Sequence, residues 1–262
     1  MSIATSKGWP ANMIEISERD GVGVLCMCDG KANAMSIEFC ELFTQRFEKL
    51  QASPVPAIVI TGSARIFSAG VDLLRLLDGG VPYILDFLPK LTRMLADVFS
   101  CSKPVVAAIN GHAVAGGCVL ACAADTRLMG REAGRIGVTE LLVGVPFPTA
   151  ALEIMRCATS PQHFADVIFS GLTYAPVQAV ERGMIHEIVE SGALLSDAIG
   201  RAQALASLPP PAFALTKGQI RRAYLDQINL DTSRADVERI WTAPETLARI
   251  RDYVGRTLRK AV

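Results

Sequence analysis

Two glycine-bearing turns carry residues whose types and spacing could stabilise a negatively charged oxygen. Ala69-Gly70-Val71 lies between an apolar run and a helical pattern, and Gly116-Gly117 has the same position after the apolar run Pro104–Ile109. Glycine lets the backbone approach a ligand closely, and the first N–H groups of a helix have no intrahelical acceptor. Two such turns could aim two N–H groups at one oxygen, which is the construction of an oxyanion hole. The alternative is that the glycines only close tight turns.

The two segments that contain these turns resemble a known family signature. They read ITGSARIFSAGVDL from Ile60 and PVVAAINGHAVAGGCVLACAAD from Pro104. In this order they are similar to the paired motifs of the crotonase family, also called the enoyl-CoA hydratase/isomerase family. The resemblance implies an acyl-CoA thioester as substrate, with its oxygen held by the N–H groups of Val71 and Gly116. Coenzyme A would then be part of the substrate, and no separate cofactor is expected.

The same resemblance points to the residues that decide the reaction. Hydratases of the family use two carboxylates to activate a water; the first position is Val119 here, and the second is retained as Glu140. Glu140 precedes an apolar stretch, and burial raises the pKa of a carboxyl group and makes it a stronger base. A single base opposite an oxyanion hole fits a proton shuttle that converts 3-enoyl-CoA into 2-enoyl-CoA. The Gly-Gly-Cys-Val run and the Pro-Phe after the second position also look like the one-glutamate isomerase branch.

Other functions remain open at this stage, because one fold hosts many chemistries. Glu140 and the backbone could hold a water for hydration, another crotonase-family reaction could use the same hole, or the protein could bind acyl-CoA without catalysis. A glutamate between apolar runs can also be an ordinary surface residue. The motifs do not define the length of the acyl chain.

Further substrate contacts are expected along the same motifs. Lys31 and Ala32 occupy the place of a family segment that lines the nucleotide end of the coenzyme A site, although the spacing is one residue shorter. Lys31 could contact a phosphate or be a solvated turn residue. Where the family often has a lysine after the first turn, this chain has Leu74 followed by Arg75. The remaining predicted substrate-binding residues are Ala69, Gly70, Asp72, Leu73, Gly117, Val119 and Pro146.

Hydrophobic periodicity predicts alternating strands and helices. Strands are expected over 13–16, 22–28, 57–61, 104–109 and 183–189. Helices are expected over 36–50, 72–78 and 85–99, from 116, over 147–155 and over 161–171. The break at Gly79-Gly80 and Pro82 could mark a mobile lid or an ordinary helix corner. This order suggests parallel strands inside and helices outside, and the resemblance implies an α/β fold, the crotonase-like (ClpP/crotonase) spiral of repeated ββα units.

The chain is expected to divide into a spiral core with the acyl-CoA site, residues 1–206, and a C-terminal helical region, residues 207–262. The helices of the second part are predicted over 212–225, 231–241 and 244–259. Their apolar stripes are too short to form a separate core. By resemblance, this region packs on the spiral and builds homotrimers, which can pair into hexamers.

Composition excludes several classes of protein. The 262 residues contain 26 basic and 26 acidic side chains, so no large basic surface for nucleic acid is implied. The apolar run 104–124 is interrupted by Asn110, His112 and three glycines, which argues against a membrane span. Seven scattered cysteines are typical of reduced thiols in a cytoplasmic protein, and neither Cys26 with Cys28 nor Cys118 with Cys122 has partners for a metal site. The segment 1–10 lacks the apolar region of a signal peptide.

Overall fold

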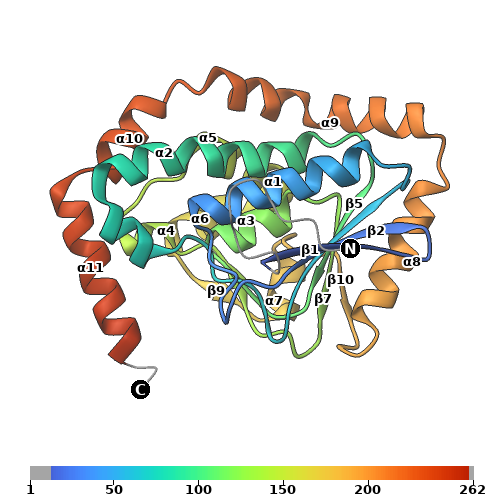
Figure 1. The fold of residues 1–262 in the computed structure, drawn as a ribbon, viewed down its shortest axis with the longest axis horizontal. Coiled ribbons are helices and arrows are strands. Elements are labelled where there is room, and N and C mark those ends of the chain that lie inside the picture. The colour runs from blue at the N-terminus through green and yellow to red at the C-terminus, as the bar shows by residue number, and fades with distance from the viewer. Residues whose placement is uncertain (1–12, 260–262) are drawn as a thin grey trace.

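A computed structural model describes residues 13–259. Segment 1–10, which was expected not to be a signal peptide, lies outside these residues. Two β-sheets form the interior (Figure 1). The larger has the order β1-β2-β3-β5-β7-β10 and the smaller β4-β6-β8-β9. In the larger sheet only β1 and β2 pair in antiparallel fashion; the other neighbours are parallel. The strands are β1 Ile14–Arg19, β2 Val22–Met27, β3 Ile58–Gly62, β4 Ile66–Ser68, β5 Val105–Ile109, β6 His112–Val114, β7 Thr126–Gly130, β8 Ile136–Gly137, β9 Thr173–Tyr174 and β10 Glu187–Val189.

The chain passes repeatedly from the larger sheet to the smaller sheet and then into a helix. The units are β3-β4-α2, β5-β6-α3 and β7-β8-α4. The helices are α1 Ile37–Ala52, α2 Leu73–Ser100, α3 Gly116–Cys122, α4 Glu140–Val143, α5 Thr149–Ala158, α6 Pro161–Ser170, α7 Pro176–Glu181, α8 Leu194–Ala206, α9 Pro210–Leu230, α10 Arg234–Trp241 and α11 Pro244–Arg259. Because equivalent strand ends recur side by side, the turns that enter α2 and α3 are brought together.

Strand residues alternate between two apolar layers. In β5, Val106 and Ala108 pack with α8, whereas Val105, Ala107 and Ile109 belong to the main core under α1, α2 and α3. This period of two is what a sheet covered on both faces requires. The strands β2, β3, β5 and β7 of the larger sheet are therefore buried on both sides, with α8 on one face and the helices that border the site on the other (Figure 1).

Several boundaries differ from the sequence prediction. Residues Leu73–Ser100 run as α2, which consists of two helical segments joined at Gly80, whose φ of 60° and ψ of −154° are outside the helical region. The expected break is thus present, as a corner between these two segments. Helix α5 begins at Thr149 after Pro148, not at Phe147, and the expected strand 183–189 is reduced to Glu187–Val189. The Ser36 cap of α1 is confirmed, since its side chain accepts the N–H of Phe39.

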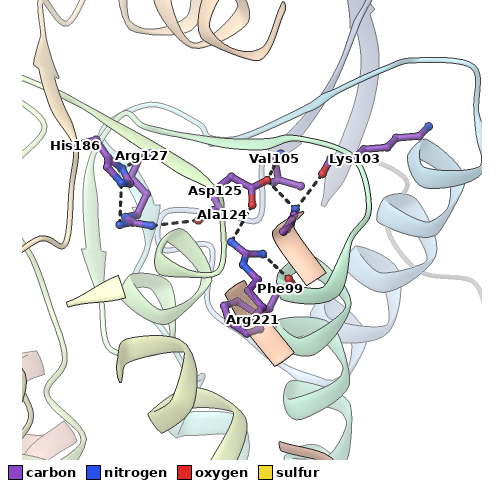
Figure 2. Close-up of polar contacts among 9 residues, drawn as sticks. Phe99, Lys103, Val105, Ala124, Asp125, Arg127, His186 and Arg221 are labelled. Atoms are coloured by element: carbon purple, nitrogen blue, oxygen red, sulfur yellow. Dashed lines mark hydrogen bonds and ion pairs between the residues drawn. The ribbon is translucent and has the colours of Figure 1, made fainter. Parts of the chain in front are cut away.

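Helix α9 is anchored to the core by a buried ionic group. Asp125 follows α3, and its carboxylate accepts from Lys217 at 2.7 Å and from Arg221 at 2.9 Å. The backbone N–H of Val105 also donates to it at 2.7 Å. Figure 2 shows Asp125 and Arg221 in this group, with Arg127 and His186 beside it. The anchor fixes α9 along α2 and α5, and α9 leads to α10 and α11, which pack against α2 (Figure 1).

Candidate active site

The two glycine-bearing turns meet in space. Gly70 has a φ of +85°, which favours glycine. A Cβ atom at Gly70 would lie 2.8 Å from the carbonyl oxygen of Val114 and 2.9 Å from the nitrogen of Gly116. Within residues 13–259, neither the N–H of Val71 nor that of Gly116 donates to a protein acceptor. Two unpaired N–H groups on adjoining turns are the donors that an oxyanion hole needs.

The first turn is held by the segment before α1. The N–H of Ala69 donates to the oxygen of Ala32 at 2.9 Å, and the N–H of Met35 donates to the oxygen of Gly70 at 2.8 Å. The N–H of Asp72 donates in turn to the oxygen of Met35 at 3.1 Å. These bonds use the backbone groups on both sides of Val71 and leave its own N–H free.

Asn33 is a buried positioning residue that sequence reasoning did not assign. Its φ is +45°, its Oδ1 accepts the N–H of Asp29 at 2.7 Å, and its Nδ2 donates to the oxygen of Phe67 at 3.0 Å. The hydroxyl of Ser68 donates to the oxygen of Asn33 at 2.8 Å and accepts the N–H of Gly70 at 3.1 Å. The signal in the sequence is that Asn33 lies, with Lys31 and Ala32, in the segment that resembles the family motif at the coenzyme A site, which also contains an asparagine before an alanine.

The second turn is strained at a residue that was not expected. Ala115 has a φ of 52° and a ψ of −127°, a region that residues with a Cβ rarely adopt. Gly116 does not have positive φ, so the backbone conformation does not require a glycine at this position. A Cβ at Gly117 would lie 2.3 Å from the oxygen of Ser68, so this glycine allows α3 to pack against β4. In this turn, Ala115 thus carries the backbone strain, Gly116 supplies the unpaired N–H and Gly117 permits close packing.

Glu140 is the first residue of α4 and lines a cavity beside these turns. Its Oε2 is sealed from solvent and has no hydrogen-bond partner among the described residues. Burial raises the pKa of this carboxyl group to about 7, and the backbone N–H groups of Glu140 and Thr139 oppose the shift only partly. A buried carboxyl group with one unpaired oxygen and this pKa can accept and return a proton near neutral pH.

The cavity has a volume of about 90 Å³ and connects the turns with Glu140. Its other walls are mostly apolar and come from α2, α3, the segment from α4 to α5, α10 and α11. The lining residues are Ala69, Val71, Leu73, Leu91, Leu95, Val114, Ala115, Gly116, Val119, Thr139, Glu140, Val143, Val145, Pro148, Ala151, Trp241 and Tyr253. Among these described residues, Glu140 is the only carboxylic acid.

Predicted site residues fall into two groups. Those that line the cavity are Ala69, Val71, Leu73, Gly116, Val119 and Glu140. The others lie outside its lining, and contact with substrate stays a prediction for both groups. Gly70 and Gly117 shape the turns, Asp72 caps α2 by accepting from Leu74 and Arg75, and the oxygen of Pro146 accepts from Trp241.

The predicted contacts with coenzyme A lie on the surface. Lys31 is exposed and Ala32 is partly buried. Arg75 is also exposed and pairs with Glu38, so its charge is already engaged. The sequence did not indicate that α10 and α11 would reach the cavity, because Trp241 and Tyr253 are far from both motifs along the chain.

Residues outside the cavity account for other features of the sequence. His186 lies against Arg127 at the surface; partial desolvation and then the positive charge of Arg127 lower its pKa to about 4, and its Nδ1 accepts the N–H of Arg127. Residues 13–259 contain no group of three or more His, Cys, Asp or Glu side chains arranged to hold a metal ion. Over the same part of the chain, no helix has the length and apolar character needed to span a membrane.

Comparisons with known proteins agree with this architecture. A family profile described as Enoyl-CoA hydratase/isomerase matches residues 17–245. A Thermus thermophilus protein named as an enoyl-CoA hydratase is 32% identical over 210 residues, 78% of this chain and 82% of its own. The solved structure of a Mycobacterium tuberculosis protein named as an enoyl-CoA isomerase is 30% identical, with a TM-score of 0.79, over 88% of this chain and 98% of its own.

The fold is also that of human mitochondrial delta3-delta2-enoyl-CoA isomerase. That structure is 21% identical, has a TM-score of 0.89 and covers 95% of this chain and 99% of its own. The expected crotonase fold, with helices at the C-terminal end, is confirmed. The names of the relatives divide between hydratase and isomerase.

Proposed function

Because the chain belongs to the enoyl-CoA hydratase/isomerase family, we propose that it isomerises 3-enoyl-CoA to 2-enoyl-CoA with Glu140 as the proton carrier. The observation that carries this proposal is that Glu140 is the only carboxylic acid among the described cavity residues, while Val119 occupies the position of a second one. Hydration is favoured by two carboxylates that activate a water together. A proton shuttle needs one.

Each step uses groups of this chain. The thioester oxygen lies between the N–H groups of Val71 and Gly116, which stabilise the negative charge that develops there. Glu140 removes a proton from C2, and the electron pair delocalises through C3 and C4 as the dienolate forms. The double bond then moves from C3–C4 to C2–C3 as Glu140 returns the proton to C4. No net proton is consumed, and coenzyme A remains attached throughout.

The environment of Glu140 supports this role. Its raised pKa of about 7 leaves a substantial fraction ionised at neutral pH, while its protonated form remains acidic enough to return the proton. The apolar walls keep water from competing for the dienolate. We also propose that the chain assembles as a homotrimer or a dimer of trimers, as the family resemblance implies.

Product analysis tests the reaction. Purified protein is incubated with 3-enoyl-CoA and, separately, with 2-enoyl-CoA, and the products are separated by chromatography. The expected result is interconversion of the two enoyl-CoA isomers without 3-hydroxyacyl-CoA. Rapid formation of 3-hydroxyacyl-CoA from 2-enoyl-CoA would instead identify a hydratase, and binding without any product would identify an acyl-CoA-binding protein.

A further inference from the structure

The cavity is small for an acyl-CoA enzyme. Its volume is about 90 Å³, whereas pockets for small molecules commonly span about 300–1,000 Å³. An engineered apolar cavity of about 150 Å³ in another protein holds one benzene molecule, with six carbons. The space beside Glu140 therefore has room for only a short hydrocarbon segment.

The wall formed by Trp241 is well fixed. Its side chain is only 2% exposed, and its indole Nε1–H donates to the oxygen of Pro146 at 2.9 Å. This bond joins α10 to the segment between α4 and α5, next to the cavity residue Val145. An indole has few rotatable bonds, and with its N–H bonded it forms a rigid boundary.

The remaining apolar walls are also packed into the core. Leu91 and Leu95 of α2 are 3% and 1% exposed, and they border the same cavity as Trp241 and Tyr253. The anchor of α9 at Asp125 holds the preceding part of the C-terminal segment against the core. The C-terminal wall is thus supported both at Pro146 and through α9.

Resting on the proposed function, which places the thioester oxygen between the two turns, we infer that the preferred substrates have short acyl groups of roughly four to six carbons. Trp241 is the residue that sets this limit. The carbonyl carbon and the three carbons that react beside Glu140 already occupy much of the cavity. A longer tail has to displace the indole from Pro146 and move α10 away from α2.

The length preference is measured by the binding of saturated acyl-CoA, which needs no reaction. Each methylene group that enters an apolar pocket tightens binding about fourfold. We expect affinity to rise from butanoyl-CoA to hexanoyl-CoA. The affinity for decanoyl-CoA should be lower, by about tenfold or more, than the value obtained by applying the fourfold increment to every methylene group of its tail. Decanoyl-CoA binding that follows the fourfold increment throughout would overturn the inference.

Variants then test the part played by Trp241. Trp241→Leu opens the wall, and we expect it to improve decanoyl-CoA binding relative to hexanoyl-CoA by about tenfold. Trp241→Phe removes the N–H but keeps most of the bulk, so the short-chain preference should persist. Val237→Ala truncates a buried residue of the same helix that does not line the cavity, and it serves as the control.

Leu95→Ala provides a second opening of the cavity if Trp241→Leu does not fold. An unchanged length preference in folded Trp241→Leu would overturn the role of Trp241. Failure of the proposed function gives a different result. A protein that binds short acyl-CoA selectively but forms no isomer would support the length limit and contradict the isomerase proposal.

Discussion

Asp125 and Glu140 are two carboxylic acids removed from bulk water, and their surroundings are opposite. Asp125 lies between Lys217 and Arg221 and also accepts the N–H of Val105. Glu140 has an oxygen with no partner in the described chain and faces apolar walls. A buried charge between two cations holds segments together, whereas a buried acid that is held only by backbone N–H groups is poised to exchange a proton.

The difference extends to the backbone around each acid. At the anchor of α9, the carbonyl groups of Lys103 and Phe99 accept further bonds from Lys217 and Arg221. At the cavity, Ala115 is held in a strained conformation and the N–H groups of two turns are left unpaired. The polar groups of the anchor are paired with one another and stabilise the fold, whereas those at the cavity remain available to bind a ligand.

The largest expected effect is the loss of turnover in Glu140→Gln. The amide keeps the shape of the side chain but cannot accept the proton, so kcat should fall by roughly 10²–10⁴-fold while acyl-CoA binding survives. Steady-state kinetics and calorimetry measure the two quantities. Glu153→Gln is the control, because Glu153 is buried outside the cavity and pairs with Arg156. Full turnover in Glu140→Gln would contradict the assignment of the base.

Asp125→Asn should instead reduce the free energy of unfolding. It removes the negative charge while Lys217 and Arg221 remain buried, which costs about 3–5 kcal/mol. Urea unfolding measures the loss. Asp236→Asn is the matched control, because Asp236 pairs with Arg239 at the surface and should cost no more than about 1 kcal/mol. Equal losses of stability in the two variants would mean that the ion pairs of Asp125 stabilise the fold no more than a surface ion pair does.

The raised pKa of Glu140 predicts that stability falls as pH rises. Between pH 4.5 and about 7, the folded protein keeps the proton while the unfolded chain loses it, so the unfolded state binds fewer protons. The free energy of unfolding should therefore decrease across this window, by at most about 3 kcal/mol from this group. Urea unfolding of the wild type and of Glu140→Gln over this range isolates the contribution. If the difference in the free energy of unfolding between the two proteins did not change with pH, the raised pKa of Glu140 would be contradicted.

The same group should shape the pH dependence of catalysis. Only the ionised form of Glu140 can act as base, so kcat/KM should rise about tenfold per pH unit below the pKa and level off above it. The midpoint is expected near pH 7. A midpoint near the ordinary glutamate value would show that the carboxyl group is solvated in the working enzyme.

The smallest expected effect tests the strain at the second turn. Ala115→Gly removes the Cβ from a positive-φ position and should raise the free energy of unfolding by about 1 kcal/mol. Ala113→Gly is the control, because Ala113 is a buried residue of β6 without positive φ and its replacement should destabilise. Destabilisation by both would indicate that the Ala115 conformation carries no strain.

Local sequence determined the parts of the site that depend on short segments. Gly70 and Gly116 could be placed at strand-to-helix turns because apolar runs, glycines and helical periodicity follow one another within a few residues. The family resemblance predicted Glu140 and Val119 as site residues, and both line the cavity. Ser36 could be assigned as a cap because capping depends on residues only three apart.

Tertiary structure alone decided the features that depend on distant segments meeting. Oε2 of Glu140 is unpaired because none of the described elements around it supplies a hydrogen-bond donor. Trp241 lines the cavity although it lies far from both motifs along the chain. The strain at Ala115 likewise arises from the packing of β6, β8 and the first turn around one residue. Periodicity describes which face of an element is buried, but not which distant side chain will lie against it.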